Sequence, residues 1–282
     1  MNKDGQGTLY LCGTPIGNLE DVTLRLVRIL TEADIIAAED TRRTLKLLNH
    51  LNIKKPVISC HEHNETARSE EIMIMLAEGK SVALVSDAGM PCISDPGEKV
   101  ARRAIEEGYA VTVIPGPSAA LAALSLSGLP TATFAFEGFL PREGKERRQA
   151  LAKLTGETRT VILYESPYRL VKTLKDMRES MGERRVAVCR ELTKVHEEVF
   201  RGTPEEAIIH FSAGEVKGEV AIVLEGKAPE TSAGPDPEEM ERLLAELLGQ
   251  GLKMKEAANI AAERLGASKN IAYKTALHLS NK

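Results

Sequence analysis

Short apolar runs alternate with helical patterns along the first two fifths of the chain. Apolar residues follow one another without alternation at 8–12, 34–38, 56–60, 81–85 and 110–114, as expected for strands that are covered on both faces. Helical patterns lie between them at 21–31, 44–51, 65–78, 98–107 and 119–126. Strands that alternate with helices indicate βαβ units. The pattern therefore predicts an α/β domain with a mainly parallel sheet.

The pattern changes after Pro130. Strands are predicted at 133–139, 160–164, 186–191, 198–202 and 219–225. Residues 192–197 can close a hairpin between two of these strands, which indicates a mixed or antiparallel sheet. The sequence thus predicts two α/β domains, an N-terminal one at 1–128 and a second one at 129–228.

A third part follows the second domain. Residues 227–237 contain three prolines and read as a linker. Three short amphipathic patterns then occupy 238–248, 255–265 and 270–279. We therefore expect a linker and a small helical C-terminal extension over 229–282.

Size and composition agree with this division. A chain of 282 residues corresponds to about two domains of ~150 residues, and 43% hydrophobic residues suffice for a sizeable core. No apolar run approaches the ~18–20 residues that span a bilayer. The polar start of the chain lacks the apolar segment of a signal peptide. The expectation is a soluble, cytoplasmic protein.

The charge balance does not indicate a general nucleic-acid binder, because such proteins are usually basic and this chain has a net charge of −4. Any contact with nucleic acid must come from local patches. Residues 251–282 carry six Lys or Arg against two Glu, whereas residues 229–250 are acidic. The basic end could contact nucleic acid, or it could be the solvated face of a small helical cap.

Two other kinds of chemistry receive little support. The four cysteines lie far apart without a CxxC pair, which indicates reduced thiols, most of them in the core. Cys60, His61 and His63 share one loop without a distant partner pair, so no metal site is predicted and Asn64 is expected to cap a helix instead. No elbow motif indicates a Ser-His-Asp or Cys-His arrangement.

Three Gly- and Pro-rich loops follow predicted strands. The first, Gly-Thr-Pro-Ile-Gly-Asn at 13–18, is either a ligand loop or a tight turn, because Pro15 removes a donor that a phosphate cradle needs. The third, Pro-Gly-Pro-Ser-Ala-Ala at 115–120, precedes a helix of small residues that Ser118 is expected to cap.

The loop at 86–97 is the most informative of the three. It follows a buried strand at the sheet edge where open α/β sheets bind ligands. Asp95 and Pro96 have a local explanation as the cap and first residue of the next helix. Asp87, Ala88 and Gly89 are left unexplained, and a carboxylate beside bare backbone suits a cationic or amine-bearing ligand. Three such loops together predict one ligand pocket.

Two further motifs place a carboxylate beside arginine just past a strand. These are Ala-Glu-Asp-Thr-Arg-Arg at 38–43 and Tyr-Glu-Ser-Pro-Tyr-Arg at 164–169. Helix capping and salt bridges explain such pairs, and a role in substrate binding is the alternative.

Taken in order, these motifs resemble those of the tetrapyrrole-methylase-like superfamily. The resemblance rests on GTPIGNLED, AEDTRR, HEHNE, SDAGMPCISDPG, PGPSA, YESPYR, RELTK and GEVAIVLEG and covers about residues 7–226. Within the superfamily the chain is similar to the small-subunit ribosomal RNA methyltransferases that modify the 2′-O-ribose of a cytidine. The helical tail resembles the C-terminal extension of that family.

The resemblance implies a fold, a cofactor and a substrate. It implies a homodimer whose two α/β domains hold S-adenosylmethionine in the cleft between them, and a cytidine in the decoding region of small-subunit rRNA as the acceptor. Tetrapyrrole enzymes carry a Gly-Asp-Pro step where this chain has Gly89-Met90-Pro91, which argues against a porphyrinoid substrate. The implied cofactor contacts are Pro15, Asp87, Gly89, Ile93, Ser118, Ala119, Leu192 and Ala221.

A ribose hydroxyl is a poor nucleophile, so a nearby general base would help it attack. The candidates from sequence are Asp40 and Glu165, with Arg42, Arg43 and Arg169 holding RNA phosphates. Two other functions are left open. One is a methyltransferase for a tetrapyrrole or another small molecule, and the other is a non-catalytic RNA-binding assembly protein.

Overall fold

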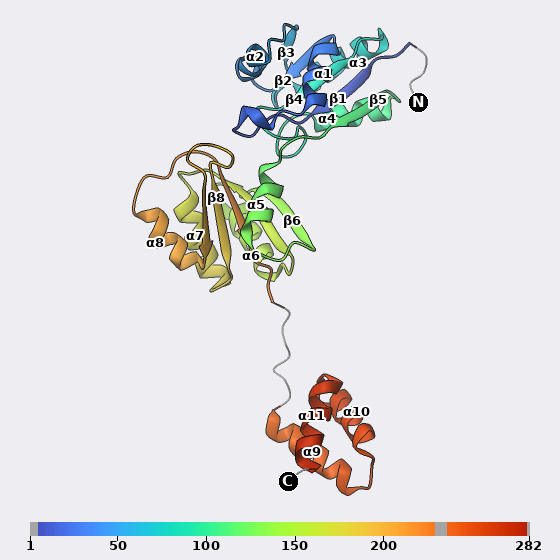
Figure 1. Cartoon of the computed structure of the whole chain (residues 1–282), viewed down its shortest axis with the longest axis vertical. Helices are drawn as coiled ribbons and strands as arrows, with labels where there is room; N and C mark the ends of the chain where they lie inside the picture. The colour runs from blue at the N-terminus through green and yellow to red at the C-terminus, as the bar shows by residue number, and fades with distance from the viewer. Residues whose placement is uncertain (1–4, 229–235, 281–282) are drawn as a thin grey trace. The chain divides into compact units, whose positions relative to one another are not determined.

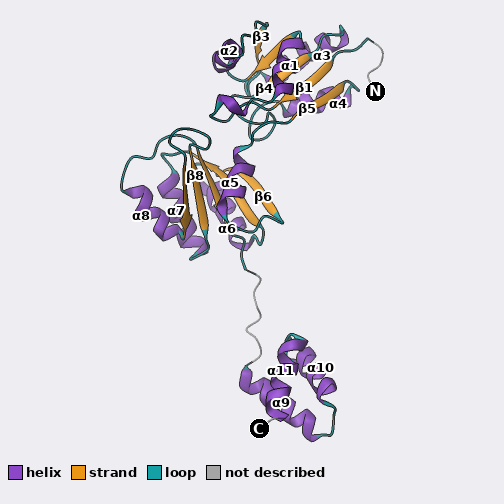
Figure 2. Ribbon diagram, viewed as in Figure 1, coloured by secondary structure: helices purple, strands orange, loops and turns teal. Residues whose placement is uncertain are grey.

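The computed structural model describes residues 5–228 and 236–280 of the chain. The chain divides into two compact units, Met1–Lys227 and Ala228–Lys282 (Figure 1). The first unit holds two five-stranded sheets with their helices. The second holds three helices (Figure 2).

All strands of the first sheet run parallel, in the order β3-β2-β4-β1-β5. The strands are β1 (Thr8–Cys12), β2 (Ile35–Ala38), β3 (Val57–Ser59), β4 (Val82–Val85) and β5 (Ala110–Ile114). The helices around it are α1 (Leu24–Glu32), α2 (Thr41–His50), α3 (Glu65–Ala77) and α4 (Glu98–Glu106), with a 3₁₀ turn η1 (Leu19–Asp21) before α1. One apolar cluster joins residues of α1 and α2 to the sheet, and another joins α3 and α4 to it. The predicted parallel sheet, with helices on both faces, is confirmed, although its edge strands β3 and β5 are only partly buried.

The second sheet is mixed, as predicted. Its order is β6-β7-β10-β8-β9, with β6 parallel to β7 and the other pairs antiparallel. The strands are β6 (Phe134–Phe139), β7 (Thr160–Glu165), β8 (Val186–Arg190), β9 (Glu198–Gly202) and β10 (Val220–Leu224). One face packs against helices α6 (Gly144–Gly156), α7 (Leu170–Met181) and α8 (Pro204–Ser212).

Helix α5 (Ala119–Ser127) covers the other face of the second sheet, although it directly follows a strand of the first. Its Ala120, Ala123 and Leu124 pack in one cluster with Ile162 and Ala187 of the sheet. Alanine side chains are short, so they let the helix axis lie close to the strands. The chain therefore passes from the first sheet to the second before residue 128, and a domain boundary at 128/129 remains a prediction.

The second compact unit consists of α9 (Pro237–Gly249), α10 (Met254–Arg264) and α11 (Lys269–Ser280). This confirms the expected helical extension. Its core combines large side chains of α9, such as Leu244, with alanines of α10 and α11, such as Ala261 and Ala272. Six Lys and Arg side chains of its described residues are exposed: Arg242, Lys253, Lys255, Arg264, Lys269 and Lys274.

Neither membrane-spanning helices nor metal clusters occur in the described ranges. No helix there is long and apolar enough to cross a membrane, and no group of His, Cys, Asp or Glu is placed to hold a metal ion. The cysteines are free, and Cys12, Cys60 and Cys189 are buried. Burial raises the pKa of Cys12 to about 12, so this thiol stays protonated and behaves as a core residue.

Candidate functional site

The three Gly- and Pro-rich loops meet at the carboxyl edge of the first sheet. The N–H of Gly13 donates to the carbonyl of Ile114 at 2.9 Å. Thr14 and Gly89 exchange two backbone hydrogen bonds of 2.8 and 3.1 Å. These bonds join the loops at 13–18 and 86–97 to each other and to the end of β5, where the loop at 115–120 begins. We call the three loops together the rim.

The glycines of the first loop let segments of the chain approach one another. A Cβ added to Gly13 would lie 2.7 Å from the backbone nitrogen of Gly116, and one added to Gly17 would lie 2.5 Å from Lys194 Cγ. Real Cβ atoms do not approach so closely. The bare backbone at Gly13 and Gly17 thus serves contacts with the third loop and with the β8–β9 hairpin.

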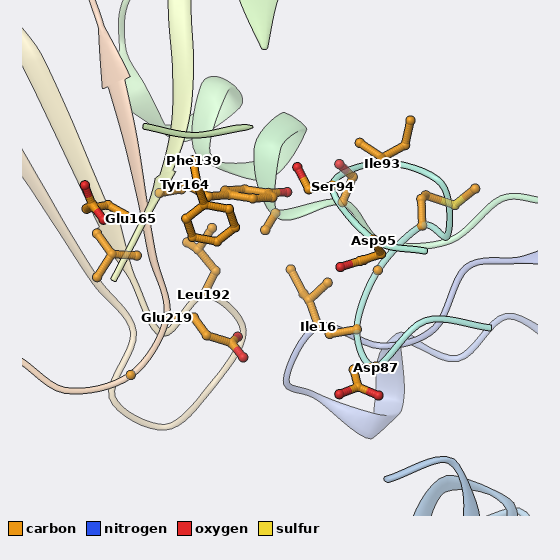
Figure 3. A pocket seen from close by; sticks show the side chains of 18 of the residues that line it. Ile16, Asp87, Ile93, Ser94, Asp95, Phe139, Tyr164, Glu165, Leu192 and Glu219 are labelled. Carbon is orange, nitrogen blue, oxygen red and sulfur yellow. The ribbon is translucent and has the colours of Figure 1, made fainter. Parts of the chain in front are cut away.

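A cavity of about 430 Å³ opens beside this rim (Figure 3). Ile16, Asp87, Ile93 and Asp95 line it from the first sheet's loops, and β6, β7 and β10 contribute residues from the other side. Figure 3 shows Asp87 and Asp95 opposite Tyr164, Leu192 and Glu219. The cavity therefore lies between the loops of one sheet and the strands of the other.

Most of the residues named from sequence line this cavity. They are Asp87, Gly89, Ile93, Ser118, Ala119, Leu192 and Ala221 among the implied cofactor contacts, with Arg43 and Glu165. Pro15 lines a smaller cavity of about 170 Å³ instead, which shares Arg43 and Asp87 with the larger one. Asp40, Arg42 and Arg169 line neither.

The larger cavity is strongly acidic. Its lining includes the carboxylates Glu39, Asp87, Asp95, Glu165 and Glu219 and one basic side chain, Arg43. Carboxylates gathered in a partly enclosed space repel one another, and a bound cation relieves that repulsion. The lining therefore favours a positively charged ligand.

Asp87 contacts several neighbouring residues on the acidic side of the cavity. Its Oδ1 accepts a hydrogen bond from the N–H of Asp40 at 2.9 Å, and its Oδ2 lies 3.4 Å from Arg43 Nε. The N–H of Asp87 donates to Glu39 Oε2 at 3.2 Å. Burial raises the pKa of Glu39, with the charge of Asp87 adding to the effect. Two carboxylates from neighbouring strand ends are thus held side by side.

Asp95 does not cap a helix, so that prediction was wrong. Helix α4 has Gly97 at its N-cap, and the buried carboxylate of Glu65 accepts the N–H groups of Gly97 and Lys99 at 2.8 and 3.0 Å. Asp95 faces the cavity instead. Burial, together with the nearby Glu39, raises the pKa of Asp95 to about 7.

Two loops beside the cavity hold non-glycine residues in the left-handed region. Cys92 and Ser94 have φ of 69° and 65° in one loop, and Glu191 and Thr193 have φ of 52° and 67° in the other. Such conformations cost free energy and persist where the surroundings fix them, often at functional sites. The loops thus present fixed backbone to the cavity.

The two carboxylates predicted as general bases are both engaged elsewhere. Asp40 caps α2 by accepting the N–H of Arg42, and it pairs with the Arg42 guanidinium at 2.8 Å, contacts that lower its pKa to about 2. Glu165 is 1% exposed at its side chain and lies 2.6 Å from Arg169. It also accepts the hydroxyl of Thr173 at 2.6 Å.

Sequence reasoning missed several lining residues, including Glu39, Ser94, Phe139, Tyr164 and Glu219. Glu39 stands beside Asp40, and Ser94 lies within the loop already singled out, so the motifs could have indicated these two. Tyr164 accepts the N–H of Ala120 at 3.1 Å. No sequence motif includes Phe139. Its position depends on a bulge in β6, which the sequence pattern did not indicate.

Family comparisons match both units of the chain. Residues 8–208 match the model described as Tetrapyrrole (Corrin/Porphyrin) Methylases. Residues 234–280 match the model described as the RsmI C-terminal HTH domain. The matched ranges correspond to the two-sheet unit and the three-helix unit.

Curated relatives of high similarity share one name, ribosomal RNA small subunit methyltransferase I. The Halalkalibacterium halodurans protein is 49% identical over 280 residues, 97% of this chain and 96% of that protein. The Escherichia coli protein is 45% identical over 278 residues, 97% and 96% respectively. The Thermotoga maritima protein is 52% identical over 221 residues, which is 78% of this chain but 99% of that protein. That relative is close in length to the first compact unit.

Solved structures agree on the fold. The cobalt precorrin-4 methyltransferase superposes with a TM-score of 0.58 at 19% identity, over 77% of this chain and 94% of that one. Uroporphyrin-III C-methyltransferase from Thermus thermophilus, complexed with S-adenyl homocysteine, gives 0.55 at 18% identity, over 78% and 97%. At these identities the likeness establishes the shared fold alone.

Proposed function

Because the chain belongs to the ribosomal RNA small subunit methyltransferase I family of the tetrapyrrole methylases, we propose that it methylates a cytidine 2′-hydroxyl in the decoding region of small-subunit rRNA. S-adenosylmethionine is the methyl donor of this family. The observation that carries the proposal is the acidic cavity beside the three motif loops.

The residues of the cavity fit this cofactor. S-adenosylmethionine carries a sulfonium and an ammonium group, and five carboxylates face a single arginine in the lining. The open backbone at Gly89, held at φ 81°, leaves room close to the chain. The proposed contacts are Asp87, Gly89, Ile93, Ser118, Ala119, Leu192 and Ala221, while Pro15 supports the rim from the smaller cavity.

When bound, S-adenosylmethionine supplies an electrophilic methyl carbon whose leaving group departs neutral. The protein's tasks are to orient the acceptor, exclude water and take up the hydroxyl proton. Ile16 and Leu192 are buried apolar residues on opposite sides of the cavity and help exclude water. The acidic lining holds the cation in place.

Basic side chains outside the cavity suit the RNA backbone. Arg42 is exposed on 86% of its side chain, and Lys46 lies one turn further along α2 beside the smaller cavity. Arg43 bridges the two cavities, and Arg169 lies beyond the larger one. In the proposed complex Arg42, Arg43 and Arg169 hold phosphates while the nucleotide enters the larger cavity.

The proposed enzyme is a homodimer that works in the cytoplasm, where small ribosomal subunits are found. The names of the relatives support the ribosomal substrate. The exposed lysines of α10 and α11 support a second RNA contact outside the catalytic unit.

The decisive experiment adds methyl-labelled S-adenosylmethionine and the purified protein to small ribosomal subunits from a strain that lacks the modification. We expect label in a dinucleotide that resists alkaline hydrolysis, because a methylated 2′-oxygen cannot attack the neighbouring phosphate. Label on a base, label on a tetrapyrrole offered in parallel, or cofactor binding without transfer would each contradict the proposal.

A further inference from the structure

Half-exposed apolar side chains border the larger cavity. Ile93 is 49% exposed and Phe139 is 56% exposed, and both belong to its lining. Unstacked bases bind by stacking on exposed aromatic rings and apolar surface. This edge therefore suits the entering nucleotide of the proposed reaction.

A bulge in β6 brings this edge against the loop that carries Asp95. The pairing of β6 with β7 shifts register between Phe136 and Gly138. Gly138 has φ 62° and lies so close to Ser94 that an added Cβ would be 3.3 Å from its Oγ. Bulges re-aim the side chains that follow them. Phe139 and Asp95 are thus held near one another through Gly138 and Ser94.

The loop fixes the direction of Asp95. Cys92 and Ser94 adopt left-handed backbone, and the N–H of Cys92 donates to the carbonyl of Pro96 at 3.3 Å. Glu65 holds the following turn through the N–H of Gly97. In Figure 3 the Asp95 carboxylate points across the cavity toward the side that carries Tyr164.

The other carboxylates of the lining are committed to protein partners. Asp87 pairs with Arg43, and Glu165 pairs with Arg169. Glu219 lies 3.2 Å from Lys194 Nζ, and Glu39 accepts the N–H of Asp87. No ion pair among residues 5–228 and 236–280 includes Asp95, and its carboxylate accepts a hydrogen bond from the uncharged hydroxyl of Ser86.

We propose that Asp95 is the catalytic proton acceptor of the reaction, a role that rests on the proposed function and adds its general base. The acceptor 2′-oxygen forms the new bond to the methyl carbon. The carbon–sulfur bond breaks and its electron pair stays on sulfur. The hydroxyl proton moves to a carboxylate oxygen of Asp95 and leaves to water after the product departs.

The surroundings of Asp95 set when it is ionised. Glu39, Asp87 and Glu219 face it with negative charge, Tyr164 faces it with a hydroxyl, and the one lining cation is Arg43. Burial, ahead of these charges, raises its pKa to about 7 in the free protein. A cation bound in the cavity favours the ionised form of Asp95 over the protonated form. Cofactor binding therefore lowers the pKa of Asp95 and leaves its carboxylate free to accept a proton.

The first test measures protons rather than activity. Cofactor binding is followed by calorimetry at pH 7 in two buffers of different ionisation enthalpy. Because a group of pKa about 7 is half protonated there, we expect the wild type to release up to about half a proton per cofactor. The Asp95→Asn variant should release much less. Equal release from both proteins would overturn the proposed titration of Asp95.

The second test measures single-turnover methyl transfer to small ribosomal subunits as a function of pH. Asp95→Asn should lower the rate about 100-fold or more while raising the cofactor Kd less than about tenfold. The wild-type rate should climb with pH to a plateau with a midpoint below 7, and the variant should lose this climb. Asp95→Glu should restore part of the rate, since it returns a carboxylate.

Controls separate the possible explanations. Glu62→Gln removes an exposed carboxylate outside both cavities and should behave as the wild type. A rate loss in Asp95→Asn matched by an equal loss of cofactor affinity would make Asp95 a cofactor anchor and overturn the proposal. An unchanged rate would overturn it too, with the function intact. A wild type that methylates no RNA would instead remove the proposed function.

Thermal unfolding tests whether the Asp95→Asn variant is folded. The folded-state pKa of Asp95 is raised from 3.8 to about 7, so stability is present at low pH and is lost as pH rises through this window. The wild type carries this penalty at pH 8 and Asp95→Asn does not. The variant should therefore melt no lower than the wild type at pH 8, and its advantage should shrink toward pH 4.

Discussion

At the scale of single residues, the Asp87 carboxylate connects neighbouring segments of the candidate site and lines its cavity. It accepts the N–H of Asp40 and pairs with Arg43, so two strand ends and the α2 start converge on it. Its position after a buried strand could be predicted from sequence, and the structure places it in the lining of the cavity. Its partners could not be predicted, because they come from residues more than forty positions earlier in the chain.

Replacement of Asp87 by Asn should weaken cofactor binding about 10- to 100-fold, because it removes a charge and a charged hydrogen bond. Calorimetric titration with S-adenosylmethionine measures the effect. Glu62→Gln is the matched control outside the cavity. Unaltered affinity in Asp87→Asn would remove Asp87 from the proposed site.

Arg42 tests the proposed RNA contact without touching the cavity. Its guanidinium is largely exposed and its ion pair is with Asp40. Arg42→Glu should raise the KM for small ribosomal subunits about tenfold by replacing attraction to a phosphate with repulsion. Cofactor affinity should stay at the wild-type level. The exposed Arg28→Glu on α1, whose partner is Glu32, is a charge-matched control. Equal KM values in the two variants would count against a phosphate contact at Arg42.

At the scale of elements, local patterns predicted the strands and their sequence along the chain better than they predicted the helices of the second domain. The apolar runs that became β1 and β4 are unbroken and lie at the centre of the first sheet. Helices α6, α7 and α8 were not predicted. Of these, α6 begins in a charged segment whose Arg147 is buried through contacts with Asp176 and Thr173. Such tertiary contacts leave no local signal in sequence.

The crossing of two loops at Gly13 and Gly116 is also an element-scale feature. Each glycine occupies the space that a Cβ on the other would need. Gly13→Ala should destabilise the protein by about 1–3 kcal/mol, because backbone on both sides resists displacement. Thermal unfolding measures this change, and cofactor binding should weaken with it.

Gly156→Ala supplies the comparison for that experiment. Gly156 ends α6 with no atom within 4 Å of an added Cβ. Alanine there should be neutral or stabilising by up to about 1 kcal/mol. Similar melting temperatures for both variants would mean that the loops at 13–18 and 115–120 have room to separate.

At the scale of the whole molecule, the three-helix unit is a compact unit with its own core, and most of the predicted linker before it lies outside the described residues. A protein that ends at Lys227 should keep the fold and the cofactor affinity of the full chain. Its RNA affinity should fall. The slope of log affinity against log salt should flatten by about 0.7–0.9 for each phosphate that the shortened protein no longer neutralises.

The full-length Lys269→Glu, Lys274→Glu variant is the companion to this truncation. Both lysines are exposed on α11, away from the unit's alanine core. A change in slope that corresponds to about two phosphates would assign the effect to charge rather than to shortening. If neither protein differs from the wild type in the salt dependence of RNA binding, Lys269 and Lys274 are solvated surface residues without a contact to RNA.

Because the chain is synthesised from its N-terminus, helix α5 is made before the strands on which it packs. Its apolar face packs on Ile162, Ala187 and Val223, all of which are synthesised after it. At ~5–20 residues per second, the roughly one hundred residues up to the end of β10 take about 5–20 s to emerge. During that time α5, which is rich in alanine and leucine, lacks these partners, although all five strands of the parallel sheet have been synthesised. The apolar side chains of α5 therefore stay without their native partners until β10 has been made, and exposed apolar surface of this kind makes a nascent chain prone to aggregation.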